Sequence, residues 1–224
     1  MISIIDVIGP SMIGPSSSHT LGAMRISKFV YNLFNSTPDN ATFYLHGSFK
    51  DTYIGHGTGL ALVAGLCGMA TDDPSVSKAD EISKRSGFNY EFKAIDLGDV
   101  HPNTVKIVAT KDNLSHEVIG SSVGGGRIKI ISIDSISCNI TGELPTLVIE
   151  NDDVPGALES IVRVISLNSV NIAQVSLSRI SKGSKIANMI LELDDELDNS
   201  IIENLRMLKI VKSMIYVKSL NYAS

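Results

Sequence analysis

The sequence predicts an α+β protein of two domains, and three observations lead to this prediction. Residues 1–143 mix short apolar strands with amphipathic helices, and the pattern resets near Gly142–Pro145. Residues 146–220 then follow the order strand–helix–strand–strand–helix–strand, which is typical of a ferredoxin-like module. A chain of 224 residues is long enough to bury two small cores. We therefore expect a mixed α/β domain at 1–143 and a ferredoxin-like domain at 146–220.

The composition restricts the classes of function. Apolar residues make up 43% and charged residues 19% of the chain, which excludes a disordered composition. A net charge of -5 argues against broad binding to nucleic acid, and no apolar run is long enough to span a membrane. The N-terminus lacks the pattern of a secretory signal, and only two cysteines are present. We expect a cytoplasmic protein with no nucleic-acid or membrane partner.

The N-terminal half begins with a helix and a strand. Apolar residues from Leu21 to Phe34 recur with helical spacing, which predicts a helix over 17–35 with Ser16 or Ser17 as its cap. A strand is expected over 41–46, and the glycine-punctuated segment 47–59 is expected to be a loop. The segments that follow predict a buried helix over 60–70, a further helix over 77–86 and a strand over 89–97.

Two hairpins should complete the first domain. Asp112-Asn113 is a good turn sequence between strands over 103–111 and 115–123, and His116 on the second of these strands should face solvent. The segments 124–134 and 135–142 predict the other hairpin. The glycine-rich stretch "SVGGGRI" lacks the lysine and hydroxyl of a P-loop, so it indicates a tight bulge or close chain packing.

The second domain should bind a small molecule or pair with another copy. We expect its first helix to have Pro155 in the first turn, where the missing N–H costs nothing. The stretches "ENDDVPGAL" and "NSVNIAQV" resemble an ACT domain, a regulatory fold that binds amino acids and usually pairs. The exposed helix N–H groups at the turn suit a carboxylate, although the same residues could serve only helix initiation and dimerisation. The resemblance implies effector contacts from five residues: Asn151, Pro155, Gly156, Asn171 and Ile172.

Four of the five histidines lie in polar, small-residue surroundings: His19, His46, His56 and His101. A Ser-His nucleophile would need a serine within reach and an acid behind the ring, and sequence adjacency to Ser18 is weak support. No H-E-x-x-H or H-x-H spacing occurs, so we assign no metal ligand to this chain. An anion site at the helix start of "GPSSSHT" remains attractive, because hydroxyl and N–H groups hold a carboxylate well.

The ordered motifs "IGPSSSHT", "GSFKDTYIGHGTG", "HPNT" and "SVGGGRI", followed by the ACT-like module, resemble the β chain of iron–sulfur L-serine dehydratases. The resemblance covers nearly the whole chain. It implies conversion of L-serine to pyruvate and ammonia, with a [4Fe-4S] cluster whose cysteine ligands lie in the α chain. The implied partners are that α chain, L-serine and a second copy bound through the ACT domains.

The resemblance also implies the site residues. The implied catalytic residues are His19, His56 and Thr58, with His56 as the candidate base or proton relay. The implied substrate-binding residues are Ser16, Ser17, Ser18, Thr20, His101 and Asn103. The sequence departs from the family's pattern at Gly59, where an acid is frequent, and His46 stands where relatives often carry tyrosine. The first domain also resembles the allosteric substrate-binding domain of some phosphoglycerate dehydrogenases, so a non-catalytic amino-acid-binding module is the alternative.

Overall fold

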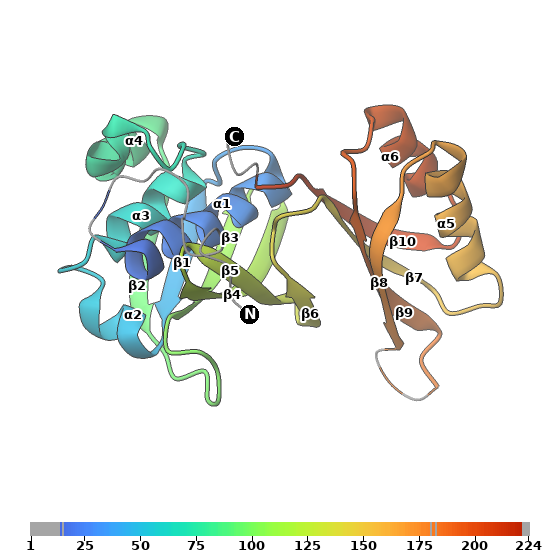
Figure 1. Ribbon diagram of the computed structural model, residues 1–224, viewed down its shortest axis with the longest axis horizontal. Helices are drawn as coiled ribbons and strands as arrows, with labels where there is room; N and C mark the ends of the chain where they lie inside the picture. The colour runs from blue at the N-terminus through green and yellow to red at the C-terminus, as the bar shows by residue number, and fades with distance from the viewer. Residues whose placement is uncertain (1–13, 15, 180, 182, 221–224) are drawn as a thin grey trace. The chain divides into compact units, whose positions relative to one another are not determined.

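The computed structural model describes residue 14, residues 16–179, residue 181 and residues 183–220 (Figure 1). The protein has an α+β fold of two compact units, with the boundary between Thr141 and Gly142. The predicted fold class is confirmed. The first unit contains a mixed six-stranded sheet and the second a four-stranded antiparallel sheet.

The sheet of the first unit has the strand order β2-β1-β3-β4-β5-β6. Strands β1 and β2 are parallel, and all the other neighbours are antiparallel. The expected hairpins are present at β3–β4 and β5–β6, the first of them turning at Asp112-Asn113. The strand bounds are β1 (Asn40–Leu45), β2 (Asn89–Ala94), β3 (Thr104–Lys111), β4 (Leu114–Gly124), β5 (Arg127–Ile133) and β6 (Ile136–Ile140).

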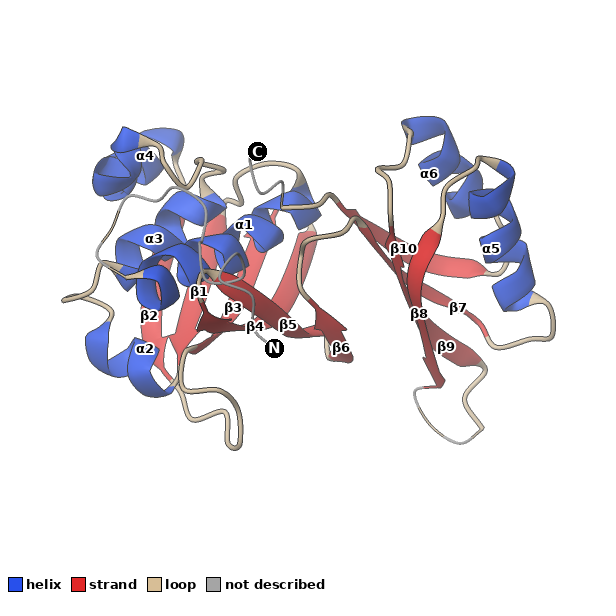
Figure 2. Ribbon diagram, in the orientation of Figure 1, coloured by secondary structure: helices blue, strands red, loops and turns tan. Residues whose placement is uncertain are grey.

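Helices cover one face of this sheet (Figure 2). Helix α1 (Gly22–Phe34) packs against both the sheet and α3 (Thr58–Leu66), and glycines permit the close approach. A Cβ on Gly65 would lie 2.2 Å from the Met24 carbonyl oxygen, and one on Gly120 would lie 2.7 Å from Ile26 Cγ2. The remaining helical elements are η2 (Ser17–Leu21), α2 (Gly47–Thr52), η3 (Pro74–Lys78) and α4 (Ala79–Ser86).

Segment 47–59 is not the loop that we expected. Its first part forms helix α2 because Phe49 is fully buried and because Thr52 Oγ1 donates to the Ser48 carbonyl at 2.6 Å. The apolar anchor and the turn-closing hydrogen bond outweigh the glycines at the two ends of the segment. The expectation for His116 was also wrong, because its side chain is 14% exposed and its Nδ1 lies 2.7 Å from Asp134 Oδ2.

The glycine-rich stretch forms the turn between β4 and β5, with a register shift beside it, as the sequence indicated. Gly126 has φ +74° and lies so close to Leu21 that a Cβ would approach Leu21 Cδ2 to 2.4 Å. Its carbonyl accepts a hydrogen bond of 2.8 Å from the buried Arg25 Nη1. The stretch therefore allows close chain packing beneath the start of α1.

The second unit has the expected strand–helix–strand–strand–helix–strand order and the sheet order β10-β7-β9-β8. Both helices pack on one face of the sheet (Figure 1), over a core that includes Leu147, Ile161, Leu191 and Leu205. Pro155 does not lie in the first turn of α5, because Gly156 with φ +85° is the N-cap. The elements are β7 (Thr146–Asp152), α5 (Ala157–Leu167), β8 (Ile172–Arg179), β9 (Ile186–Leu193), α6 (Asn199–Arg206) and β10 (Val211–Val217).

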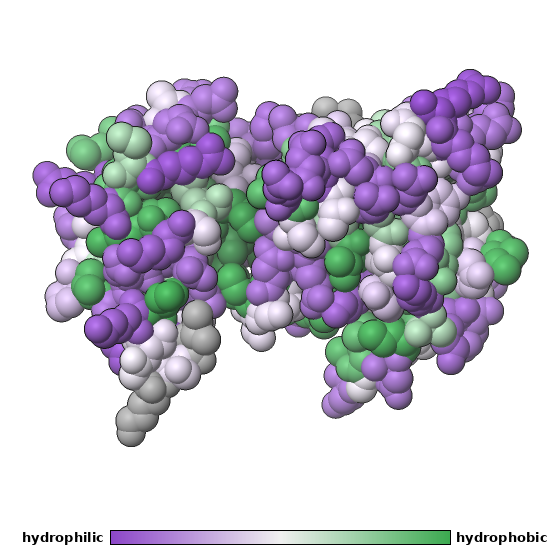
Figure 3. All heavy atoms as spheres, turned by 180° about the vertical axis from the view of Figure 1, so that it is seen from behind, coloured by the Kyte–Doolittle hydropathy of each residue, from purple (hydrophilic) through white to green (hydrophobic). Residues whose placement is uncertain are grey.

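Hydrophilic residues gather over α4, as Figure 3 shows. The exposed face of that helix carries Glu81, Lys84 and Arg85. None of the helices in the described part of the chain is long and apolar enough to cross a membrane.

Candidate functional site

The segment after Ser16 forms a π-helical turn, η2 (Ser17–Leu21), that leads directly into α1. Ser16 is the N-cap, since its Oγ accepts the backbone N–H of His19 at 3.1 Å. The cap prediction is confirmed for Ser16, whereas Ser17 lies exposed inside the turn. π-Helical turns occur often at functional sites. The turn places the His19 side chain at the start of α1.

Two serine hydroxyls hold the His19 ring. Nδ1 lies 3.1 Å from Ser18 Oγ, and Nε2 lies 2.9 Å from Ser48 Oγ on α2. The ring also packs edge-on against Phe49, with 5.7 Å between the ring centroids. Burial, followed by repulsion from His56, lowers the pKa of His19 below its usual value. The ring is therefore neutral at neutral pH, with one nitrogen donating and the other accepting.

His56 lies beside His19 and is exposed to solvent. The two ring centroids are 5.2 Å apart and the ring planes are tilted by 34°. Thr20 Oγ1 donates to the His56 carbonyl at 3.1 Å, and the His56 N–H donates to the Thr52 carbonyl at 3.0 Å. These two bonds fix the backbone of the loop between α2 and α3 and leave the His56 ring open to the outside.

The "HPNT" loop connects to the same cluster through α2. The Ser48 N–H donates to the Pro102 carbonyl at 2.9 Å. Gly47 makes this approach possible, because a Cβ there would lie 2.6 Å from the Pro102 oxygen and its φ is +51°. His101 Nδ1 accepts the Asn103 N–H at 3.1 Å, and the Asn103 carbonyl accepts the Ser122 N–H at 2.9 Å. His101 is exposed and Asn103 is half-buried.

The structure thus brings together most of the residues expected at the site, from η2, the α2–α3 loop and, through Ser48, the "HPNT" loop. Thr58 differs, because it is fully buried in the first turn of α3. Its Oγ1 has no hydrogen-bond partner within the described ranges. Ser48 and Phe49 were missed, although both belong to the quoted "GSFKDTYIGHGTG" motif.

The geometry of the cluster disfavours a hydrolase. The group on Nε2 of His19, opposite Ser18, is the hydroxyl of Ser48 rather than the carboxylate that a catalytic triad requires. His46, which we left out of the site, accepts the Leu97 N–H at 3.1 Å through Nδ1 and lies 3.7 Å from Asp96. The arrangement can bind polar groups, orient them and exchange a proton at the exposed His56 ring.

The cysteines do not fit a [4Fe-4S] cluster in this chain. Such a cluster is held by four cysteine thiolates, and the sequence contains two cysteines. Burial raises the pKa of Cys67 to about 11, which keeps the thiol protonated. Cys138 Sγ lies 3.4 Å from the Ile130 carbonyl. Among the described residues, no group of three or more His, Cys, Asp or Glu side chains could hold a metal ion.

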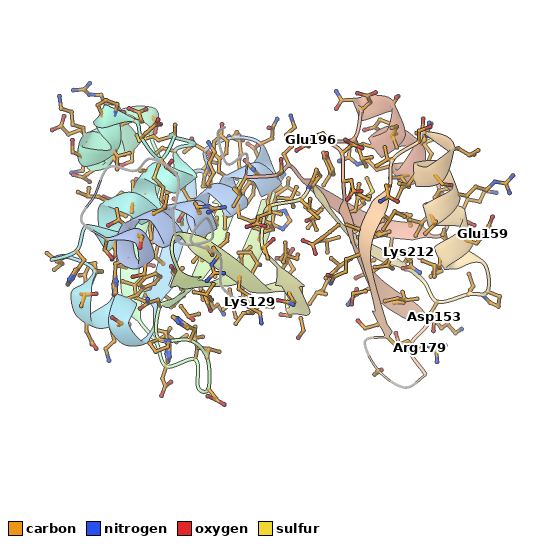
Figure 4. The ribbon with its side chains drawn as sticks, in the orientation of Figure 1. Lys129, Asp153, Glu159, Arg179, Glu196 and Lys212 are labelled. Carbon is orange, nitrogen blue, oxygen red and sulfur yellow. The ribbon has the colours of Figure 1, made fainter. Side chains whose placement is uncertain are left out.

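The residues expected to bind an effector lie in the second unit, around the turn from β7 to α5. Asn151 is 1% exposed, and its Oδ1 has no hydrogen-bond partner in the described part of the chain. Ion pairs flank the turn. Arg179 pairs with Asp153 (Figure 4), and Lys212 Nζ lies 2.9 Å from Asp152 Oδ2. The turn is therefore already rich in paired charges.

The expected effector set is not gathered in one place within the unit. Asn151 pairs in register with Ala187, and Arg179 on β8 pairs with the same residue. Ile172, at the other end of β8, pairs with Leu193. Asn171 and Ile172 therefore lie at the opposite end of the sheet from the β7–α5 turn. Asn171 Nδ2 donates instead to Asp194 Oδ2 at 2.6 Å.

The family model and the relatives that cover most of the chain name the same family. Residues 3–94 match the serine dehydratase beta chain family. The chain is 35% identical over 206 residues to a Bacillus subtilis protein named "Probable L-serine dehydratase, beta chain", covering 92% of this chain and 93% of that protein. It is 38% identical over 206 residues to the L-serine dehydratase, beta chain, of Peptoniphilus asaccharolyticus, with 91% and 90% covered. The Escherichia coli L-serine dehydratase TdcG is 38% identical over 95 residues, 39% of this chain and 21% of that protein.

Proposed function

The chain belongs to the serine dehydratase beta chain family, and on that premise we propose that it is the β subunit of a two-chain L-serine dehydratase. The enzyme would convert L-serine to pyruvate and ammonia in the cytoplasm. The observation that supports this most is the His19–His56 pair, surrounded by serine hydroxyls from separate segments. This pair combines a half-buried neutral ring with an exposed one, an arrangement that suits proton transfer.

The site residues of this chain would have separate roles toward the substrate. Elimination of water from serine needs removal of the α-proton, and the product enamine becomes an imine that hydrolyses to pyruvate and ammonia. His56 is the candidate base or proton relay, because its ring is exposed while Thr20 holds its backbone. The hydroxyls of Ser16, Ser17 and Ser18 at the helix start would bind the substrate carboxylate.

The α chain would supply what this chain lacks. The family resemblance assigns a [4Fe-4S] cluster to the α chain, where it would act as a Lewis acid on the serine hydroxyl. The cysteine chemistry of the β chain does not fit that cluster. The match to TdcG covers only 21% of that protein. The rest of TdcG is long enough to include a region that a two-chain enzyme would have on its α chain. The site would therefore be completed by another polypeptide.

The second unit would act as an ACT-type regulatory domain that pairs with a second copy. Strand β8 is the edge of its sheet, and Val175 and Leu177 on it are 44% and 48% exposed. An antiparallel β8–β8 pairing would cover both side chains and satisfy the free edge. It would also bring Asn171 of the second copy toward the end of the sheet where Asn151 lies. The unpartnered Asn151 Oδ1 favours an amino-acid effector there.

Co-expression with a cognate cysteine-bearing α chain, purified without air, tests the proposal. The reconstituted enzyme should form pyruvate from L-serine, and neither chain should do so alone. His56→Ala should lower kcat by at least about 100-fold if His56 handles the proton. A wild-type pair that carries its cluster and makes no pyruvate would refute the function. If His19→Ala and His56→Ala alter only the response to serine, at an unchanged maximal rate, the chain is instead a non-catalytic regulatory module.

A further inference from the structure

The sequence motifs did not predict the contact that the Ser48 side chain makes. Its Oγ lies 2.9 Å from His19 Nε2, across 29 residues of sequence. Ser18 Oγ holds the opposite nitrogen at 3.1 Å. A neutral imidazole has one N–H and one lone pair, and a serine hydroxyl can serve either, so the two hydroxyls can satisfy both nitrogens.

The backbone of Ser48 is fixed independently of His19. Its N–H donates to the Pro102 carbonyl at 2.9 Å, and its carbonyl accepts the Thr52 hydroxyl at 2.6 Å. Phe49, the next residue, is fully buried and packs edge-on against the same imidazole. The Ser48 hydroxyl therefore projects from a fixed stretch of backbone. A side chain that orients another side chain needs such support.

We propose that Ser48 is a positioning residue that fixes the orientation of the His19 ring and connects that ring to the "HPNT" loop. The Ser48 hydroxyl contacts the His19 ring, and the Ser48 N–H donates to the Pro102 carbonyl of the loop. Without the hydroxyl, His19 would keep only its bonding to the serines of its own turn and its packing. The catalytic consequence rests on the proposed function, whereas the effect on the ring does not.

The first experiment measures the ring itself by NMR of the full-length β chain without a partner. Nuclear Overhauser contacts between the ring protons of His19 and Phe49 report the orientation of the imidazole, and His19→Gln assigns the signals. In the wild-type chain these contacts should be strong, because the His19 ring packs edge-on against Phe49. In Ser48→Ala they should weaken, because Nε2 then faces no fixed hydroxyl and the ring can rotate. Ser48→Thr, which keeps the hydroxyl, should restore them.

The second experiment measures catalysis in the two-chain enzyme. Ser48→Ala should lower kcat about tenfold, as expected for the loss of one hydrogen bond, with a smaller change in KM. Ser48→Thr should recover most of kcat. Ser77→Ala is the matched control, because Ser77 is exposed on η3 and its hydroxyl bonds only the Pro74 carbonyl among the described residues. It should behave like the wild type in both experiments.

The two experiments separate the possible failures. Contacts between the His19 and Phe49 rings that are unchanged in Ser48→Ala, or a kcat that falls equally in Ser48→Ala and Ser48→Thr, would overturn the positioning role. If Ser48→Ala does not fold, Ser48→Cys takes its place, since a thiol is a much weaker partner for the ring. A wild-type pair that is inactive while the His19 ring contacts respond as expected would refute the proposed function and leave the positioning role supported.

Discussion

The contact between α1 and β4 should be very sensitive to one added methyl group. Gly22 begins α1, the helix that continues the turn of His19, and a Cβ on Gly22 would lie 1.9 Å from Ser122 Oγ and 2.6 Å from Ser122 Cβ. Ser122 is fully buried on β4, so it has no free space into which to move. In Gly22→Ala, the helix and the strand must therefore separate.

The expected magnitude follows from two opposing effects. Overpacking of this kind costs up to about 3 kcal/mol, and replacing glycine within a helix returns roughly 0.5–1 kcal/mol. Gly22→Ala should therefore destabilise the first unit by about 2 kcal/mol. In a Ser122→Gly background the nearest remaining atom of that residue is its Cα at 3.5 Å, an ordinary contact. There the same substitution should stabilise by roughly 0.5–1 kcal/mol, so the coupling energy is about 3 kcal/mol.

Chemical denaturation of the four chains of this cycle measures the coupling. The sequence has no tryptophan, so the transition of the first unit would be followed by far-ultraviolet circular dichroism and by tyrosine fluorescence. A coupling energy below about 0.5 kcal/mol would refute the reasoning, because it would mean that α1 and β4 do not touch at this position.

Three further predictions concern the surface, a thiol and a histidine. Ile54 is 81% exposed beside His56, so Ile54→Ser should weaken binding of the α chain about tenfold in a pull-down titration. Leu114, at the turn between β3 and β4, is 61% exposed, and the control variant Leu114→Ser should bind the α chain as the wild type does. Because its pKa is raised from 9.0 to about 11, Cys67 should be alkylated about 100-fold more slowly than a free thiol at pH 8, and faster as the pH approaches 11. Burial lowers the pKa of His19 in the folded chain, so the unfolded chain binds a proton at this residue more readily. The contribution of His19 to the stability of the fold is therefore present above pH 6.5 and is lost as the pH falls below 6.5. Denaturation midpoints measured from neutral pH to about pH 5 should therefore fall less in His19→Gln than in the wild type.

Local patterns in the sequence were sufficient for the order of the strands, and they narrowed the cap of the first helix to Ser16 or Ser17. The helix start depends on residues within one turn, and hairpin signals such as Asp112-Asn113 act over two residues. The strand order of the second unit follows from its alternation of elements, because only a few topologies place such a series in one sheet.

Contacts that cross the chain could not be predicted in this way. The bond between His19 and Ser48 depends on how α2 packs, and the sequence pattern of α2 suggested a loop because glycines lie at both ends. His116 reaches Asp134 only because the β4–β5 register places a turn residue beside it. The separation of Asn151 from Asn171 follows from β7 and β8 both pairing antiparallel to β9, which makes them parallel to each other.

The two histidines of the candidate site are linked through charge and through the backbone. Protonation of His56 places a positive charge near a ring that burial already keeps neutral, and this repulsion contributes to the lowered pKa of His19. A proton on His19 is therefore disfavoured, and its ring stays neutral with one nitrogen donating and the other accepting. Since Thr20 follows His19 in the chain and bonds the backbone of His56, one turn of helix determines both the charge state of the first ring and the place of the second.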